Sequence, residues 1–347
     1  MPRPDVLSER RGAYIAGIGG QVPGAPIGNE HFADVGVDAS WVRKRTGIVT
    51  RHWITDTQSL LDLAVVAARA ALDDAGLSSD DLDFIIASTI TADLVTPGLG
   101  PQLAGALGAK QTPAVDLNAA CAGFIFALDY ACALIDSGRA QTVLVCAAEA
   151  LSRITNRQDR STAVLFGDGA GAVVVRSGPA VDGIQAFCLG GDAGAHQLLF
   201  ADRDERLLRM DGPAVYEAAV SSMVTCTTEA CARAGVDIDE LDLFVAHQAN
   251  ARILRAVCRE LGISDEVAYV HVDRVANTSS ASIPLALHAA EVEGRLAAGD
   301  RVGVVAFGAG FTWGAGILSW KPNQAPIPAK RLPTHKREIP SHEGDTA

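Results

Sequence analysis

Three side chains capable of acyl-transfer chemistry stand in short motifs: Cys121 in LNAACAGFIFALDY, His247 in VAHQAN and Asn277 in ANTSSAS. Cys121 opens an apolar helix, and the positive end of the helix dipole predicts a lowered thiol pKa there. A thiolate with an imidazole and a carboxamide as donors suits thioester chemistry, because both donors can stabilise an enolate or an oxyanion. Taken singly, each residue also has a structural explanation: a core thiol, a hydrogen-bonded core histidine or a helix N-cap.

The segments around these motifs alternate in type. Short β-branched runs typical of strands occupy residues 84–89, 142–148, 172–175, 243–248 and 302–307. Ala-rich segments typical of helices occupy residues 59–75, 121–136, 214–234 and 250–261. This alternation predicts layers of α-helices and β-sheet rather than a β-sandwich.

An internal repeat divides the chain. Residues 71–87 align without gaps on residues 230–246 at an offset of 159, with seven of 17 positions identical. At the same offset NAACA (118–122) lies on NTSSA (277–281), and VLVCA (143–147) lies on VGVVA (302–306). The repeat predicts one α/β unit written twice. We therefore predict an N-terminal half over residues 1–178 with Cys121, and a C-terminal half over 179–320 with His247 and Asn277.

The repeat also predicts that the three reactive side chains meet. Cys121 and Asn277 lie in corresponding loops, and His247 follows the strand whose counterpart ends at Ser88. Ligands of α/β sheets gather beyond the carboxyl ends of strands. Two halves related by a pseudo-twofold axis bring those ends to one cleft, so we expect Cys121, His247 and Asn277 to converge there.

Composition excludes several classes of protein. The 347 residues carry 29 basic and 41 acidic side chains, a net charge of −12, and 48% are hydrophobic. An acidic chain with no long Lys/Arg run argues against nucleic-acid binding, and no apolar run is long enough to cross a membrane.

The seven cysteines include no CxxC pair, which predicts free thiols, no metal site and a cytoplasmic location. Residues 321–347 contain five prolines and little apolar content, and are predicted to form a mobile tail.

A Gly-rich segment, FGAGFTWGAG (307–316), ends the second half. Its backbone N–H groups near Ala309 could complete an oxyanion hole together with the amide of Cys121. A tight turn is the structural alternative, and the two interpretations are compatible.

Six motifs in family order resemble those of β-ketoacyl-acyl-carrier-protein synthase III, a member of the thiolase superfamily, over about residues 12–320. They are WVRKRTGI (41–48), AACAGF (119–124), RSTAVLFGDGAG (160–171), HQANARI (247–253), NTSSAS (277–282) and FGAGFTWG (307–314). The resemblance implies a thiolase-like fold of duplicated α/β halves in a layered αβαβα arrangement. It also implies that Cys121 takes an acyl group from coenzyme A, a substrate rather than a permanently bound cofactor. His247 and Asn277 would then stabilise the carbanion formed from malonyl-acyl carrier protein as carbon dioxide leaves.

The same motifs favour a priming enzyme over its relatives. FGAGFTWG lacks the second cysteine of thiolases, and Asn277 stands where elongating ketosynthases usually have a second histidine. Two alternatives remain open: an acyltransferase of this fold that passes the acyl group to a carrier protein, hydroxyl or amine without decarboxylation, and a non-catalytic scaffold.

Further roles follow from the resemblance. Trp41, Arg45, Arg160 and Asn250 are expected to bind coenzyme A, since an indole stacks on adenine and guanidinium groups suit phosphates. Taken without the resemblance, Trp41 is a packing residue and the arginines are solvated.

The acyl pocket is expected to be completed across a homodimer interface. Some members carry a bulky aromatic residue before Pro97, where this chain has Thr96. We therefore predict a pocket that admits primers larger than acetyl.

An acyl carrier protein is expected to dock on a basic helix face. Arg252, Arg255 and Arg259 recur at helical spacing, whereas Glu217 and Glu260 occupy positions that are often lysine in the family. A solvated helix face is the alternative.

Ala276 and Ala309 stand where the family often has glycine, which reduces backbone clearance.

Overall fold

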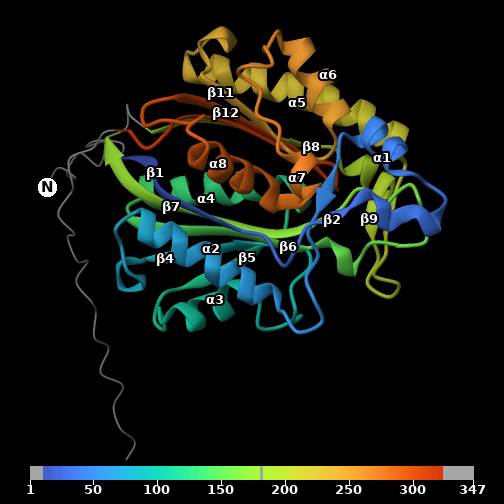
Figure 1. Cartoon of the computed structure of the whole chain (residues 1–347). Helices are drawn as coiled ribbons and strands as arrows, with labels where there is room; N and C mark the ends of the chain where they lie inside the picture. Colours follow the sequence, from blue (N-terminus) through green and yellow to red (C-terminus); the bar gives the residue numbers. More distant parts are fainter. Residues whose placement is uncertain (1–10, 180–182, 323–347) are drawn as a thin grey trace, which may run out of the picture.

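The computed structural model describes residues 11–179 and 183–322 and is built around two β-sheets (Figure 1). The first sheet has the strand order β1-β7-β6-β4-β5. Its strands are β1 (Arg11–Gln21), β4 (Phe84–Ser88), β5 (Ala114–Leu117), β6 (Thr142–Ala150) and β7 (Asp168–Pro179). β4 runs parallel to β5 and β6, whereas β7 is antiparallel to both β1 and β6.

The second sheet repeats this order with one strand fewer. Its order is β11-β12-β13-β8, with β11 (Leu243–Ala246), β12 (Arg301–Gly308), β13 (Thr312–Ser319) and β8 (Ile184–Gly191). β11 and β12 are parallel, and β13 is antiparallel to β12 and β8. In place of a counterpart to β5, Val267 and Tyr269 exchange backbone hydrogen bonds with Phe244. The strand orders agree with a duplicated unit, while the division at residue 178 stays a prediction.

Helices form three layers around the two sheets (Figure 1). α4 (Gly123–Asp136) and α8 (Ser282–Val292) lie between the sheets and share one buried cluster with strands of both. α2 (Leu60–Asp74) and α3 (Leu99–Leu107) cover the outer face of the first sheet. α5 (Gly212–Ala234) and α6 (Ala251–Leu261) cover the outer face of the second. The arrangement is the αβαβα layering that the resemblance implied.

Local signals in the sequence set the ends of these elements. Ser59 caps α2 in a capping box with Asp62. α5 carries Pro213 in its first turn and is followed by Gly235 in the left-handed region. Glycines let α2 approach the first sheet closely. A Cβ on Gly17 or on Gly19 would lie 2.3 Å from a backbone oxygen of α2, so neither position tolerates a side chain.

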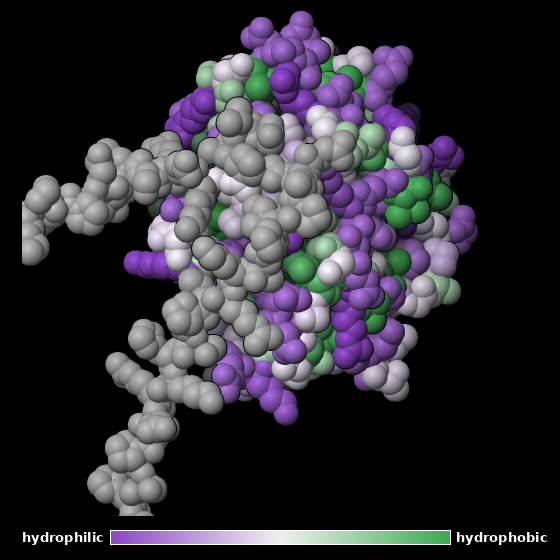
Figure 2. Space-filling model, turned by 90° about the vertical axis from the view of Figure 1, so that its left-hand side faces the viewer, coloured by the Kyte–Doolittle hydropathy of each residue, from purple (hydrophilic) through white to green (hydrophobic). Residues whose placement is uncertain are grey.

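Smaller elements complete the described chain. They are β2 (Ile27–Gly28), β3 (Thr50–Arg51), β9 (Leu199–Ala201), β10 (Leu208–Met210), α1 (Ala39–Thr46), α7 (Val272–Val275) and seven short 3-10 turns. Within residues 11–179 and 183–322, every helix is too short or too polar to span a bilayer. On the visible part of the face in Figure 2, apolar groups are small and interrupted by hydrophilic side chains.

The predicted tail lies almost wholly outside the described residues. Lys321 is described, and its ammonium group pairs with Asp74 and with Glu291.

Candidate active site

Two loops with the same backbone carry the predicted site. In each, an asparagine Oδ1 accepts the backbone N–H two residues ahead, over 3.2 Å from Asn118 to Ala120 and 2.8 Å from Asn277 to Ser279. Ala120 and Ser279 both have a positive φ, 46° and 51°. A single 3-10 turn follows in each loop, and then α4 or α8 begins. The sharp turn brings the residues of both loops to the space between the two sheets.

Cys121 lies in the 3-10 turn Ala120–Ala122, directly before α4. Burial, with a smaller contribution from the Glu149 carboxyl, raises the pKa of its thiol to about 12. The sequence-based prediction of a lowered pKa is therefore wrong for the free protein. Loss of hydration outweighs the helix dipole, so the thiol holds its proton at neutral pH.

His247 follows β11 and is fixed on both its backbone and its ring. Its N–H donates to Val305 O over 2.7 Å, and its Nδ1 lies 2.6 Å from Ser282 Oγ. Ser282 Oγ also accepts the Gln248 N–H over 3.3 Å, so its own hydrogen is free for Nδ1. We assign the ring hydrogen to Nε2 on this basis. Burial lowers the pKa of His247 to about 4, so the ring is a neutral hydrogen-bond donor at pH 7.

Asn277 is held by three hydrogen bonds that leave its amide nitrogen available. Its backbone N–H donates to Leu165 O and its carbonyl accepts from Gly167 N, each over 3.0 Å, while Oδ1 accepts from Ser279. The residue is 8% exposed. Within the described part of the chain, no hydrogen bond engages Nδ2, which can donate to a bound ligand.

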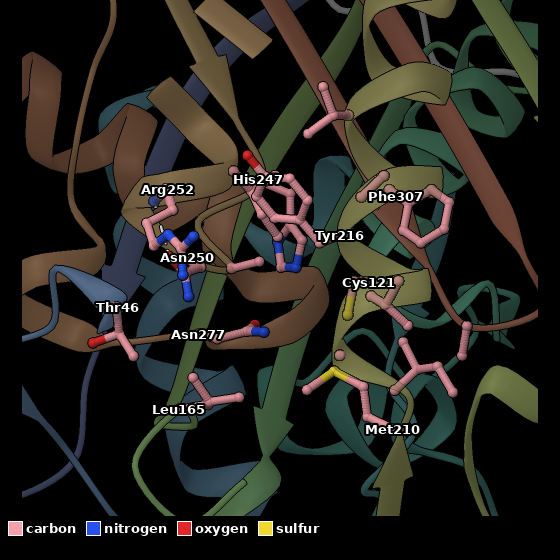
Figure 3. A pocket seen from close by; sticks show the side chains of 18 of the residues that line it. Thr46, Cys121, Leu165, Met210, Tyr216, His247, Asn250, Arg252, Asn277 and Phe307 are labelled. Atoms are coloured by element: carbon pink, nitrogen blue, oxygen red, sulfur yellow. Dashed lines mark hydrogen bonds between the residues drawn. The ribbon is translucent and has the colours of Figure 1, made fainter. Parts of the chain in front are cut away.

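One cavity of about 1090 Å³ is lined by all three residues, Cys121, His247 and Asn277. Figure 3 shows the thiol, the imidazole nitrogens and the carboxamide directed at the same space. Apolar side chains form much of the remaining wall, among them Leu165, Leu208, Met210, Val215 and Phe307. Such a wall excludes water from a reacting thioester and suits an acyl chain.

Backbone groups at the end of β12 reach the nucleophile. A Cβ on Gly308 would lie 2.7 Å from Cys121 N, so only glycine lets β12 approach this amide so closely. The next residue, Ala309, lines the same cavity. The oxyanion hole predicted from Cys121 and Ala309 stays a prediction.

Three of the four residues expected to bind coenzyme A line this cavity: Trp41, Arg45 and Asn250. The Arg45 guanidinium lies 5.7 Å from the centre of the Trp41 ring. Asn250 caps α6 by accepting the Arg252 N–H over 2.8 Å and donates from Nδ2 to Arg45 O over 3.3 Å, which ties α6 to α1. Arg160 is exposed and does not line the cavity, although its neighbour Ser161 does.

Thr96 does not line the cavity of its own chain. It is exposed on the loop between β4 and α3, beside Leu94 and Val95, which are 49% and 88% exposed. The prediction of an acyl-pocket residue at this position therefore depends on a second copy of the chain.

The three arginines of α6 are exposed, as helical spacing predicted. Arg252 lines the cavity 6.0 Å from the Tyr216 ring, and Arg259 lies 3.4 Å from Glu260 in an exposed pair. Glu217 and Glu260 also line the cavity, so the rim carries both signs of charge.

Sequence reasoning missed several residues that support the site. Ser282 orients His247, Gly308 makes room at the Cys121 amide, and Glu149 is a buried carboxyl next to the Asn277 loop. The repeat offset could have found the last two, because positions 149 and 308 correspond.

The layered fold and the Cys/His/Asn cavity define a thiolase-like acyltransferase. The model of 3-oxoacyl-[acyl-carrier-protein (ACP)] synthase III matches residues 115–193, and the model of its C-terminal part matches residues 231–320. The chain belongs to the β-ketoacyl-[acyl-carrier-protein] synthase III family, which confirms the resemblance read from the motifs.

Relatives of known sequence or structure are similar over nearly their whole length. Beta-ketoacyl-[acyl-carrier-protein] synthase III of Rhodospirillum rubrum is 40% identical over 319 residues, covering 88% of this chain and 98% of the relative. The 3-oxoacyl-[acyl-carrier-protein] synthase III of Aquifex aeolicus is 39% identical with a TM-score of 0.87, covering 89% and 100%. The priming β-ketosynthase of the R1128 polyketide pathway is 32% identical with a TM-score of 0.86, covering 92% and 99%.

Proposed function

We propose that this protein primes fatty-acid or polyketide synthesis by condensing an acyl-CoA primer with malonyl-acyl carrier protein. The observation that carries the proposal is the single cavity into which a thiol, a neutral imidazole and a free carboxamide are directed. Membership of a family of synthases named for acyl carrier protein supports the choice of acceptor.

In the first half-reaction, Cys121 takes the acyl group. Its sulfur attacks the thioester carbonyl of acyl-CoA and the carbon–sulfur bond to coenzyme A breaks. The proton of the Cys121 thiol passes to the departing sulfur, which leaves as the free thiol of coenzyme A. The backbone N–H groups of Cys121 and Ala309 would hold the oxyanion of the tetrahedral intermediate. Because acyl-CoA enters and free coenzyme A departs, acyl-CoA is a substrate and not a resident cofactor.

In the second half-reaction, His247 and Asn277 hold the malonyl thioester. His247 Nε2–H and the Asn277 amide donate to its carbonyl oxygen and stabilise the enolate that forms as carbon dioxide leaves. The enolate carbon then attacks the acyl group on Cys121, which releases 3-oxoacyl-carrier protein and restores the thiol after protonation. A neutral imidazole is needed for this role, and the lowered pKa of His247 provides it.

We assign the outer end of the cavity to coenzyme A and the carrier protein. Trp41 and Arg45 would contact the nucleotide, with Asn250 beside the pantetheine arm, while Arg160 would need to reach in from the surface. Arg252, Arg255 and Arg259 present three cations on one face of α6 to an acidic carrier protein.

We also propose a cytoplasmic homodimer. β5 stands at the edge of its sheet with Val115 38% exposed, and the nearby loop exposes Leu94 and Val95. Pairing of this edge would cover apolar surface and carry Thr96 toward the partner's cavity. The seven free thiols fit a reducing compartment.

Release of carbon dioxide tests this function. Purified protein is loaded with acyl-CoA and mixed with malonyl-carrier protein labelled in its free carboxyl group. We expect labelled carbon dioxide and 3-oxoacyl-carrier protein in equal amounts, and Asn277→Ala should lower both at least 100-fold while Cys121 still becomes acylated. Acyl transfer to the carrier protein without carbon dioxide would instead support the simpler acyltransferase.

A further inference from the structure

The amide of Gln248, just after β11, is fully buried and does not line the cavity, and the proposed reaction leaves it unused. Its Nε2 donates to Ala246 O over 2.7 Å and to Tyr269 O over 3.2 Å. Its Oε1 accepts the backbone N–H groups of His271 and Val272 over 2.7 and 3.0 Å. Every donor and acceptor position of this amide is therefore occupied, and the partners fix which end is the nitrogen.

The two N–H groups that Gln248 accepts open α7, the short helix that leads to Asn277. Val272 is the first residue of α7, and its carbonyl accepts the Ala276 N–H over 3.0 Å. Val272 and Ala276 also pack in one buried cluster with Ala251. A line of hydrogen bonds therefore runs from the Gln248 amide through α7 to the residue directly before Asn277.

The same residue is joined to His247 through the backbone. Gln248 follows His247 directly, and its own N–H donates to Ser282 Oγ over 3.3 Å. Ser282 Oγ lies 2.6 Å from His247 Nδ1 and orients the ring. Gln248 therefore connects the segment of one enolate donor, His247 Nε2–H, to the segment of the other donor, the Asn277 amide.

The second sheet needs this connection because it has no counterpart to β5. In the first sheet β5 pairs with β4 up to Leu117, so the sheet itself places the next residue, Asn118. In the second sheet Tyr269 bonds to Phe244, and the chain then leaves the sheet before α7 begins. The Gln248 amide supplies the hydrogen bonds that a paired strand would otherwise make.

We propose that Gln248 is a positioning residue that sets the place of Asn277 relative to His247 for the decarboxylation of the malonyl thioester. This inference rests on the proposed function, because it assumes that both side chains donate to one carbonyl oxygen. Two donors stabilise the enolate only when both reach that oxygen, and a displacement of about 1 Å can cost about 100-fold in rate. Cys121 lies on a different loop, so its acylation does not depend on this connection.

Comparison of the two half-reactions tests the proposal. Gln248→Met has a similar volume and removes all four hydrogen bonds of the amide. We expect carbon dioxide release from malonyl-carrier protein by the acylated enzyme to fall about 10- to 100-fold, while acylation of Cys121 changes less than about threefold. Labelled carbon dioxide and intact mass measure the two steps. Equal losses in both half-reactions, or an unchanged release of carbon dioxide, would overturn the proposal.

A double variant separates positioning from a general structural role. If Gln248 acts by placing Asn277, its loss has little effect once the Asn277 amide is gone. In the Asn277→Ala background, Gln248→Met should therefore lower carbon dioxide release by less than about threefold. Losses that multiply in the double variant would show that the two residues act independently, and the proposal would be wrong.

Asp83→Ala is the matched control for lost hydrogen bonds. Asp83 Oδ2 accepts two successive backbone N–H groups, those of Gln141 and Thr142, over 2.7 and 3.0 Å. Asp83 does not line the cavity, so both half-reactions should keep the wild-type rates while thermal stability falls. A loss of carbon dioxide release alone in Asp83→Ala would assign the effect to destabilisation and contradict the proposal.

Gln248→Glu decides if thermal unfolding shows that Gln248→Met does not fold. One oxygen of its carboxyl can still accept both N–H groups of α7. The other oxygen lies against two carbonyl oxygens, so the buried carboxyl keeps its proton and donates one hydrogen bond in place of two. We expect a loss confined to carbon dioxide release, and equal losses in both half-reactions would again overturn the proposal.

Binding of an unreactive ligand separates this inference from the proposed function. A malonyl-coenzyme A analogue with an amide in place of the thioester offers the same carbonyl oxygen and resists acyl transfer. Calorimetry should show that the analogue binds the wild type about fivefold more tightly than Gln248→Met. If it does so but the wild type releases no carbon dioxide, the proposed function fails and the placement of Asn277 stands.

The remaining outcomes are equally distinct. If carbon dioxide is released and Gln248→Met matches the wild type in both assays, the inference fails and the proposed function stands. If the wild type neither binds the analogue nor releases carbon dioxide, both fail.

Discussion

The two asparagine loops share a backbone and differ in what stands opposite them. Cys121 corresponds to Ser280 at the repeat offset of 159, and Glu149 corresponds to Gly308. In one loop Gly308 lies against the Cys121 amide and leaves space, and in the other Glu149 binds Ser280 and fills the equivalent space.

A second pair of positions shows the same contrast. His247 corresponds to Ser88 and Ser282 to Gly123. His247 is bonded to Ser282, whereas a Cβ on Gly123 would lie 2.1 Å from Ser88 Oγ. The duplicated backbone thus supplies two equivalent positions for a site. A few differences in side chains leave space at the Cys121 loop and fill it at the Ser280 loop.

The largest expected effect comes from filling the space that Gly308 leaves beside the Cys121 amide. Gly308→Ala would place a methyl group 2.7 Å from Cys121 N, too close to a backbone atom to be absorbed without movement. We expect acylation of Cys121 to fall at least 100-fold, because a displaced oxyanion-hole amide costs about 3 kcal/mol or more. Intact-mass kinetics with acyl-CoA measure this.

Gly105→Ala is the matched control for that substitution. Gly105 lies in α3 with nothing within 4 Å of a Cβ, so acylation should be unchanged. Equal losses in the two variants would contradict the account of the open site.

The buried carboxyl of Glu149, which fills the corresponding space beside Ser280, should make the free energy of unfolding depend on pH. The pKa of Glu149 is about 7 in the folded chain and 4.5 in a free side chain, so the folded state binds the proton more tightly. The contribution of Glu149 to stability is therefore fully present below pH 4.5 and is lost as the pH rises to about 7, by about 3 kcal/mol. Urea unfolding of Glu149→Gln should lack this loss, while the opposite contribution of neutral His247 is common to both proteins.

Ser282→Ala sharpens the contrast at the histidine. Without the Ser282 hydroxyl, His247 loses the group that fixes its ring and leaves the hydrogen on Nε2. Carbon dioxide release should fall about 10–100-fold, whereas acylation of Cys121 should change less than about threefold. Ser137→Ala, at the end of α4 away from the cavity, is the control. Equal losses in both half-reactions would contradict a role confined to His247.

The smallest expected effect concerns the entry to the Asn277 loop. Ala276 has φ 59° and ψ −159°, a combination that favours glycine. Ala276→Gly should raise the free energy of unfolding by about 1 kcal/mol, since it relieves strain at a small entropic cost. Urea denaturation measures this, and a loss of stability would contradict the strain.

The sequence predicted the elements more fully than the energetics of the site. The helical segments at 59–75 and 250–261 match α2 and α6 within two residues, and the repeat brought Asn277 to the Cys121 loop. The raised pKa of Cys121 was missed because it depends on burial by residues distant in the sequence. The exposure of Arg160 agrees with the alternative of a solvated arginine, and the place of exposed Thr96 at a homodimer interface stays a prediction.

Mapping the acyl group after exposure to acyl-CoA tests the central claim most directly. The chain has seven free thiols, and only Cys121 lines the cavity with His247 and Asn277. We predict one acyl group per chain, located by peptide mass spectrometry on Cys121 and absent in Cys121→Ser. An acyl adduct on another cysteine, or no adduct with any acyl-CoA, would contradict the assignment of the Cys121 loop as the reactive one.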